Sequence, residues 1–304
     1  MLDLSIVIVN YRSWDKLEAC LLSLQNQSQK IKSVIVVDNY SNDGILDTFS
    51  HRFPEVDWIP NDYNAGFAAG CNLGSQKVGT KWLLFLNPDT LLPAETLGTL
   101  IPYCDRHPDF HLITICQLSE SGKNTHPYGI FPNVWNSLGL LRAMDRRFFH
   151  PDQTKKSMRQ SPIAFPHWIS GSFVLIRKKH FEELKGWDER FWMYCEDIDL
   201  SKRAADNHLN RVLLNGWECL HSHGVSSRKD PATKIFTKAE VIKSTHRYIE
   251  KHFQGNAKKT AQQWLRFHKF LELSLLGFID NKKWKILKLL RPFWRELFSS
   301  RPHF

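Results

Sequence analysis

The stretch that decides the fold is Trp82-Leu83-Leu84-Phe85-Leu86-Asn87-Pro88-Asp89-Thr90. Five apolar residues in a row are typical of a strand buried on both faces, and a polar turn follows them at once. Proline ends the strand and fixes the turn, so Asp89 is held at the strand's carboxyl end. A carboxylate there suits a divalent metal because hard cations take oxygen ligands, although an ordinary polar turn has the same composition.

The same pattern of an apolar strand followed by polar residues recurs earlier in the chain. Residues 4–10 and 33–37 are short β-branched runs, and helical patterns separate the predicted strands. Strands that alternate with helices predict an α/β fold with a mostly parallel sheet, flanked by helices on both faces. Ligands bind beyond the carboxyl ends of such strands, where Asn10, Tyr11 and Asp38 fall together with Asp89.

Two features near this edge have more than one explanation. Asp38 could accept hydrogen bonds from a nucleoside, or it could cap a helix or a turn. Gly66, Gly70 and Gly74 are four residues apart, which favours close helix packing and does not match the dinucleotide-binding GxGxxG pattern. Gly66 could also let a nucleotide approach the backbone.

The densest acidic cluster outside the C-terminal region is Glu196-Asp197-Ile198-Asp199, which follows an aromatic run at residues 191–194. If a helix begins here, Asp199 and Arg203 lie four residues apart and form a structural ion pair. Glu196 and Asp197 remain at the helix start, where aromatic surroundings would raise the pKa of a carboxylate and suit a general base. Acidic residues are also common there because they complement the helix dipole.

Two histidines follow the strand predicted at residues 211–214. His221 and His223 are two residues apart, and we expect at most one of them to meet a metal. A structural role for both is the alternative.

Together these motifs resemble family 2 glycosyltransferases of the GT-A fold, in particular the rhamnosyltransferase-like branch. The order and spacing of the matching segments, spread over residues 4–227, carry the resemblance. They are Val7-Ile8-Val9-Asn10-Tyr11, Val37-Asp38-Asn39 with Ser41, residues 64–72, Leu86-Asn87-Pro88-Asp89, Ser170-Gly171-Ser172, residues 186–191, residues 196–200 and His221. The resemblance implies a GT-A catalytic domain over residues 1–227, with a nucleotide-binding half at 1–118 and an acceptor half at 119–227.

The resemblance also implies an inverting transfer of a sugar, with rhamnose as first candidate, to a hydroxyl of a glycan or lipid-linked oligosaccharide in cell-surface polysaccharide synthesis. Asp197, with Glu196 beside it, would be the general base. Mg²⁺ or Mn²⁺ would be held by Asp89 and His221, with His223 as second choice, and Asn87 replaces the first carboxylate of the DXD-like turn. The nucleotide-sugar donor (dTDP-rhamnose, or a UDP- or GDP-sugar) would contact Asn10, Tyr11, Asp38, Asn39, Gly66, Asn72 and Asn87, and the acceptor would contact Ser170, Gly171 and Trp192.

The net charge of +10 is concentrated in residues 228–304. This C-terminal region has 18 Lys and Arg against 6 Asp and Glu, whereas the first 227 residues have 23 against 25. Aromatic and aliphatic residues alternate with these cations, which predicts basic amphipathic helices. Their apolar face could lie on an anionic membrane, on the body of the protein, or on a second subunit in a homodimer.

The expected cellular location depends on membrane-spanning and targeting segments. No run of 18 apolar residues and no basic leader occurs, so we expect neither a transmembrane span nor a signal peptide. Six scattered cysteines without a CxxC pair indicate reduced thiols. We expect a cytoplasmic protein, with peripheral contact to the inner face of the membrane as an option.

Two other classes of protein are alternatives to a glycosyltransferase. A nucleotidyltransferase that forms nucleotide sugars would carry a Gly-rich basic loop after the first strand, where this chain has Asn10-Tyr11-Arg12-Ser13. A non-enzymatic protein that binds nucleic acid or membrane would explain the basic C-terminal region but leave the acidic strand ends unexplained. We therefore expect an enzyme that binds no nucleic acid.

Overall fold

A mixed β-sheet forms the centre of the structure. The computed structural model describes residues 1–133, 148, 155–222, 231–278 and 280–299. Within these residues nine strands form one sheet, in the order β3-β2-β1-β4-β10-β6-β11-β5 with β8 beside β11. The strands are β1 (Leu2–Asn10), β2 (Ile31–Asp38), β3 (Asp57–Pro60), β4 (Trp82–Leu86), β5 (Thr90–Leu91), β6 (Leu112–Leu118), β8 (Ile163–Ala164), β10 (Phe173–Arg177) and β11 (Arg211–His221).

The sheet is mostly parallel, as predicted. β1 runs parallel to β2 and β4, β2 to β3, and β6 to β11. β10 lies antiparallel between β4 and β6, and the short strands β5 and β8 lie antiparallel to β11. The carboxyl ends of β1, β2 and β4 therefore meet at one edge, where Asn10 pairs in register with Asp38.

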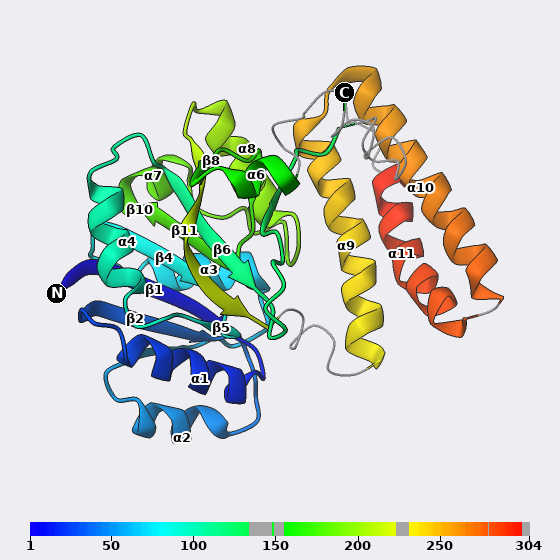
Figure 1. Cartoon of the computed structure of the whole chain (residues 1–304). Coiled ribbons are helices and arrows are strands. Elements are labelled where there is room, and N and C mark those ends of the chain that lie inside the picture. The colour runs from blue at the N-terminus through cyan, green and yellow to red at the C-terminus, as the bar shows by residue number, and fades with distance from the viewer. Residues whose placement is uncertain (134–147, 149–154, 223–230, 279, 300–304) are drawn as a thin grey trace.

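Helices cover both faces of the sheet (Figure 1). Ile6 and Ile8 pack on one face with α1, α2 and α4, and Val7 and Val9 pack on the other with α3, α7 and α8. This division follows from the strand itself, since successive side chains point to opposite faces. The helices are α1 (Trp14–Gln25), α2 (Ile45–Arg52), α3 (Phe67–Ser75), α4 (Thr96–Asp105), α6 (Lys155–Gln160), α7 (Lys178–Glu183) and α8 (Glu196–Asp206).

Residues 168–177 are divided between two sheets. β9 (Trp168–Ile169) pairs with β7 (Tyr128–Gly129) in a separate two-stranded sheet, and β10 of the main sheet begins only at Phe173. The turn at Ser170-Gly171-Ser172 separates them because its backbone groups bond to other segments. Ser170 N donates to Pro127 O, and Ser172 O accepts from Asn87 N. The Ser170-Gly171-Ser172 motif therefore forms a turn at the sheet edge.

Two further differences concern β6 and β11. β6 is absent from the predicted elements, although residues 112–116 are an apolar run, and it pairs with both β10 and β11. β11 continues past its predicted end at residue 214 to His221, with an irregularity between Leu214 and Glu218. The extension places His221 opposite Thr90 of β5.

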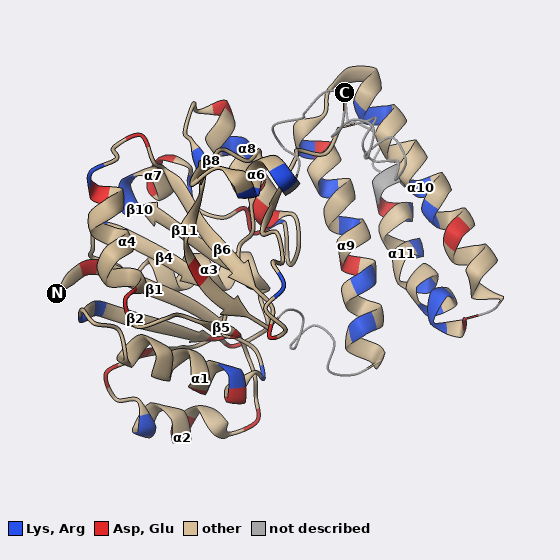
Figure 2. Cartoon of the chain, viewed as in Figure 1, with Lys and Arg blue, Asp and Glu red and all other residues tan. Residues whose placement is uncertain are grey.

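Three long helices stand beside the sheet at the C-terminal end (Figure 1), which confirms the predicted helical region. They are α9 (Pro231–His252), α10 (Gly255–Gly277) and α11 (Asn281–Ser299). Ile242 of α9, Leu273 of α10 and Leu287 of α11 share an apolar cluster separate from the sheet. Lys and Arg outnumber Asp and Glu along these three helices (Figure 2). None of the described helices has both the length and the apolar character that crossing a bilayer requires.

Candidate active site

Asp38 and Asn10 lie side by side at the ends of β2 and β1. Asn10 Nδ2 donates to Asp38 Oδ1 (3.4 Å), and Ser41 donates to both oxygens, through Oγ (2.5 Å) and through its backbone N (3.2 Å). Burial raises the pKa of Asp38, and the hydrogen bonds from Ser41 oppose this rise. The guanidinium of Arg12 lies 5.3 Å from the centroid of the Tyr11 ring. Asn10, Tyr11 and Asp38 thus meet at the predicted edge.

Asn39 is buried and organises the loop that leads into α3. Its Nδ2 donates to Asn64 Oδ1 and to the carbonyl of Gly66, both at 3.0 Å. Its Oδ1 accepts from Ala65 N and Asn61 Nδ2. The structure therefore brings Asn39 and Gly66 together, as the donor-site prediction requires, and the contact of either with a donor stays a prediction.

Gly66 has a backbone conformation that side chains rarely adopt, with φ at +89°. A Cβ atom at this position would lie 2.1 Å from the carbonyl oxygen of Trp192, which also accepts a hydrogen bond from Phe67 N (2.9 Å). Trp192 Nε1 in turn donates to Asn64 O (3.0 Å). Glycine is required here for the close approach of the Trp192 segment, whatever its contact with a nucleotide.

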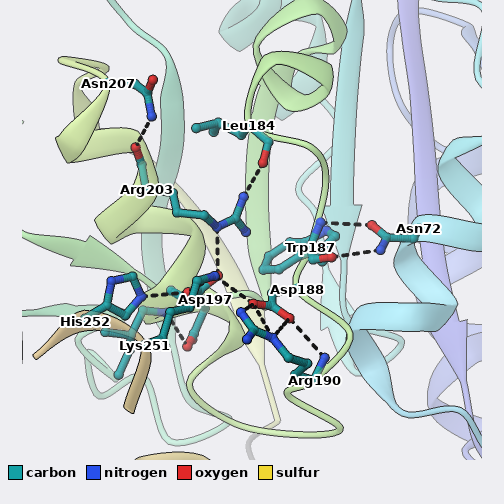
Figure 3. A network of polar contacts seen from close by, with 12 residues as sticks. Asn72, Leu184, Trp187, Asp188, Arg190, Asp197, Arg203, Asn207, Lys251 and His252 are labelled. Atoms are coloured by element: carbon teal, nitrogen blue, oxygen red, sulfur yellow. Dashed lines mark hydrogen bonds and ion pairs between the residues drawn. The ribbon is translucent and has the colours of Figure 1, made fainter. Parts of the chain in front are cut away.

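Asn72 of α3 binds the turn that precedes the acidic cluster (Figure 3). Its Nδ2 donates to Trp187 O and its Oδ1 accepts from Trp187 N, both at 2.9 Å. Nδ2 also donates to Glu189 Oε1 (2.8 Å). These bonds give Asn72 a structural function, and its predicted contact with the donor remains a prediction.

Asp89 and His221 form a buried pair between the turn after β4 and the end of β11. Asp89 Oδ1 lies 3.2 Å from His221 Nε2 and, within the described residues, accepts no hydrogen bond of proper geometry. Asn87 Nδ2 lies 3.4 Å from the same ring nitrogen. His221 Nδ1 lies 2.9 Å from Gln117 Oε1, an acceptor, so Nδ1 carries the proton. In neutral His221 the lone pair of Nε2 then faces a carboxylate oxygen, an arrangement that suits a bound cation.

Gln117 is a site residue that sequence reasoning missed. It is fully buried near the end of β6, and its Oε1 also accepts from Ser172 Oγ (2.9 Å). A polar residue after an apolar run was the available signal, but β6 itself was not among the predicted strands. Gln117 orients His221 from behind, a role that commonly falls to the outer neighbours of metal ligands.

The turn of Ser170, Gly171 and Ser172 connects this pair to the acidic cluster. Ser172 accepts from Asn87 N (3.0 Å), and Gly171 N donates to Asp197 Oδ2 (3.2 Å). A Cβ at Gly171 would lie 3.7 Å from the Cβ of Asp197. The turn after β4 and the start of α8 are therefore neighbours through one three-residue segment, although 108 positions separate Asp89 from Asp197.

Glu196 and Asp197 occupy the first turn of α8 in different surroundings. Glu196 is buried, its Oε2 has no hydrogen-bond partner among the described residues, and burial together with the charge of Asp197 raises its pKa well above the ordinary value. Asp197 is half-buried, and burial raises its pKa while the N–H groups of Gly171 and Ile198 oppose the rise. Asp197 is therefore the accessible carboxylate of the two.

The predicted ion pair within α8 is confirmed. Arg203 Nε lies 2.8 Å from Oδ2 of Asp199, whose side chain is fully buried. Ahead of this helix, Tyr194 and Cys195 both have left-handed backbone conformations, with φ at +69° and +65°. His223, the second candidate ligand, lies outside the described residues.

Comparison with known proteins identifies the family. The model of "Glycosyl transferase family 2" matches residues 5–184, more than half of the chain. This chain is a family 2 glycosyltransferase. Its fold is GT-A, and the glycosyltransferase prediction is confirmed over the nucleotidyltransferase and the non-enzymatic alternatives.

Relatives of this glycosyltransferase include two rhamnosyltransferases. N-acetylglucosaminyl-diphospho-decaprenol L-rhamnosyltransferase of Mycobacterium tuberculosis is 26% identical over 271 residues, which cover 83% of this chain and 85% of that protein. Rhamnosyltransferase WbbL of Escherichia coli K12 is 26% identical over 255 residues, 80% of this chain and 91% of that protein. The glycosyltransferase is thus rhamnosyltransferase-like.

A solved structure supports the fold assignment. The crystal structure of GalNAc-T7 with UDP, GalNAc and Mn²⁺ matches with a TM-score of 0.56 at 13% identity. The match covers 86% of this chain, which spans 55% of that chain. At this identity the likeness concerns the arrangement of helices and strands.

Proposed function

We propose that this glycosyltransferase moves a sugar from a nucleoside diphosphate to an acceptor hydroxyl with inversion at the anomeric carbon. The observation that carries the proposal is the Ser170–Ser172 turn, which joins the Asp89–His221 pair to Asp197. In this proposal the Asp89–His221 pair would hold a cation and Asp197 would act as the base, near the sheet edge that Asp38 also occupies. Rhamnose is the first candidate sugar because two relatives are rhamnosyltransferases, which makes dTDP-rhamnose the first donor to test, ahead of UDP- and GDP-sugars.

Asp197 is the proposed general base. Its carboxylate accepts two backbone hydrogen bonds that fix its direction, and it remains partly accessible to an acceptor. It would take the proton of the acceptor hydroxyl as that oxygen attacks the anomeric carbon, opposite the departing diphosphate. Glu196 is too deeply buried for this role, and burial together with the charge of Asp197 raises its pKa.

Asp89 and His221 are the proposed ligands of Mg²⁺ or Mn²⁺. The buried Oδ1 of Asp89, which accepts no hydrogen bond among the described residues, and the ring nitrogen of His221 that faces it fit such an ion. Among the described residues no group of three or more His, Cys, Asp or Glu is arranged to hold a metal, so oxygens of the donor diphosphate would complete the coordination. A bound ion would neutralise charge on the leaving diphosphate.

The proposed acceptor is a glycan or a lipid-linked oligosaccharide, recognised by the acceptor half through Ser170, Gly171 and Trp192. A relative acts on a diphospho-decaprenol, by its name. A pocket in the acceptor half of this chain is lined by His126, Lys156, Arg159 and Gln160, whose cations complement a lipid-linked diphosphate.

A lipid-linked acceptor would favour contact with the membrane, and we assign that contact to α10. The outward side chains of this helix include Trp264, Phe267, Phe270, Leu275 and, at its end, Phe278, which are 42%, 59%, 48%, 61% and 82% exposed. Ten Lys and Arg against two Glu on α10 and α11 match an anionic lipid surface. The enzyme would then work as a cytoplasmic protein peripheral to the inner face of the cell membrane; sedimentation with vesicles tests this.

Two substitutions test the assignment of the site. Asp197→Asn should retain binding of dTDP with Mn²⁺ while kcat with dTDP-rhamnose falls about 10²- to 10⁴-fold, because a general base is lost. Asp89→Ala should instead weaken nucleotide binding, and only when Mn²⁺ is present. Calorimetric titration with and without Mn²⁺, beside a transfer assay, separates the two. Equal losses of nucleotide binding in both variants would contradict these roles.

A further inference from the structure

Helix α9 reaches the segment that holds Asp197. Lys251 and His252, at its C-terminal end, point toward the start of α8 (Figure 3). His252 Nε2 lies 2.7 Å and Lys251 Nζ lies 2.6 Å from Oδ1 of Asp199. Lys251 Nζ also lies 2.7 Å from Oδ2 of Asp188, in the turn before the aromatic run. Lys251 thus connects Asp188, ahead of the aromatic run, to Asp199, in the first turn of α8.

Asp199 depends on these partners. Its side chain is fully buried, two positions after Asp197 in the first turn of α8, and a buried carboxylate is costly unless it is paired. Burial alone would raise the pKa of Asp199, but the hydrogen bond from His252 and the charges of Arg203 and Lys251 outweigh burial and lower it. Arg203 belongs to α8 itself, so the attachment to another element comes from α9.

Helix α9 also contacts the residues ahead of α8. Ser244 Oγ donates to the carbonyl of Met193 (2.8 Å), and the Phe236 ring packs edge-on against Trp192, with centroids 5.2 Å apart. The left-handed Tyr194 and Cys195 lie between these contacts and the Asp199 cluster. Left-handed conformations of such residues cost energy and persist only where the surroundings impose them. α9 supplies contacts on both sides of the strained pair.

We propose that α9 is a positioning element of the active site and that Lys251 and His252 are positioning residues that act through Asp199 and Asp188. They fix the Trp192–Asp199 segment, and with it the direction of Asp197. The role in transfer rests on the proposed function of Asp197 as base. The residues lie beyond residue 227, in the C-terminal region, and beyond the segment matched by the family model. The catalytic unit would thus include α9, which belongs to the C-terminal region predicted to lie outside the catalytic domain of residues 1–227.

The test compares three substitutions in α9. Lys251→Met removes the charge and keeps the length of the side chain, and Lys251→Arg keeps the charge. Glu250→Gln is the matched control, because Glu250 is exposed and its one ion pair among those described is with Lys258, at 3.7 Å. Lys251→Met should lower kcat with dTDP-rhamnose about tenfold or more, since small displacements of a reacting group are that costly. The KM for the donor and the affinity for dTDP with Mn²⁺ should change less than about twofold.

Lys251→Arg should recover most of kcat, and Glu250→Gln should match the wild-type protein. A second readout needs no substrate: hydrogen exchange in a peptide covering residues 193–200 should become faster in Lys251→Met, while the strands of the sheet stay protected. If Lys251→Met does not fold, His252→Gln is measured in the same way.

The outcomes separate two failures. If the wild-type protein transfers no sugar but exchange at residues 193–200 rises in Lys251→Met, positioning by α9 stands and the proposed donor is wrong. Unchanged exchange in this peptide overturns the positioning role, with or without activity. A parallel loss of kcat and nucleotide affinity, with faster exchange throughout the sheet, also overturns it, because Lys251 would then serve general stability.

Discussion

Glu196 and Asp197 are adjacent in the chain, yet they differ in their access to solvent and in their hydrogen bonds. Asp197 accepts from Gly171 N and Ile198 N, whereas Glu196 Oε2 is buried without a partner among the described residues. A neutral carboxylic acid tolerates such a position better than a carboxylate does, which is why burial raises the pKa of Glu196. Burial therefore raises the pKa of both side chains, and only for Asp197 do hydrogen bonds from Gly171 N and Ile198 N oppose the rise.

The raised pKa of Glu196 predicts how stability changes with pH. Below the ordinary pKa of glutamate both the folded and the unfolded states are protonated, and the full stability is present. As pH rises from the ordinary value toward the raised one, the unfolded chain loses its proton first, so the free energy of unfolding decreases. Glu196→Gln removes this titration, and its Tm should exceed that of the wild-type protein increasingly across this window.

Thermal unfolding at several pH values measures the effect, with the exposed Glu250→Gln as control. A difference in Tm that is independent of pH would show that Glu196 ionises normally in the folded protein.

At the scale of elements, the start of α3 and the segment that precedes α8 are in close contact beside the candidate active site. Gly66 and Trp192 approach so closely that no side chain fits between them, and Phe67 N bonds to the same Trp192 carbonyl. Gly44, at the start of α2, also has a positive φ of +74°, but a Cβ there would meet nothing within 4 Å. Substitution of the two glycines therefore distinguishes the energetic cost of a left-handed backbone, present at both, from the cost of a steric clash, present only at Gly66.

Gly66→Ala is expected to destabilise the protein by more than the approximately 1–3 kcal/mol of backbone strain alone, because the added methyl group displaces Trp192. Gly44→Ala should cost only about 1–2 kcal/mol, the ordinary penalty of a left-handed residue. Urea unfolding of both variants measures the difference. Equal destabilisation would mean that the Trp192 segment moves aside without loss.

At the scale of the whole molecule, the three C-terminal helices differ in which of the three explanations of the basic region applies to them. α9 packs on the body through Phe236, Ser244 and Lys251, and α11 buries Leu287 and Leu290 within the helical layer. Several large apolar side chains of α10, Phe267 and Leu275 among them, remain exposed, whereas Leu273 is buried. Packing on the body therefore accounts for α9, and the outer face of α10 is left for the proposed membrane contact.

The membrane contact predicts a defined loss of binding. Phe267→Ser combined with Leu275→Ser should weaken sedimentation with phosphatidylglycerol vesicles more than about tenfold, since each buried side chain contributes roughly 1.5–3 kcal/mol at most. Phe165→Ser is the matched control, because Phe165 is 49% exposed and lies between β8 and β9, outside the C-terminal helices. Binding should also weaken at high salt as the cations are screened.

No binding to vesicles by the wild-type protein would contradict this assignment. Self-association that disappears in the Phe267→Ser, Leu275→Ser variant would instead assign the face to a homodimer.

The sequence by itself determined the parts of the protein that depend on local pattern. Apolar runs with polar ends predicted β1, β2 and β4 and the edge where Asn10, Asp38 and Asp89 lie. Spacing along one helix predicted the Asp199–Arg203 pair, because residues four apart face each other in any helix. The ordered set of motifs led to the family that the comparison confirmed.

Only the tertiary structure decided the contacts between distant segments. Three links join positions 52 to 110 residues apart: Gln117 with His221, the turn that joins Asn87 to Asp197, and the attachment of Lys251 to Asp199. Local pattern holds no information on such pairings, since the pairing of strands and the packing of helices set them. The hydrogen bond from Gly171 N to Asp197 was therefore decided by the tertiary structure, whereas the place of an acid at a helix start followed from the sequence alone.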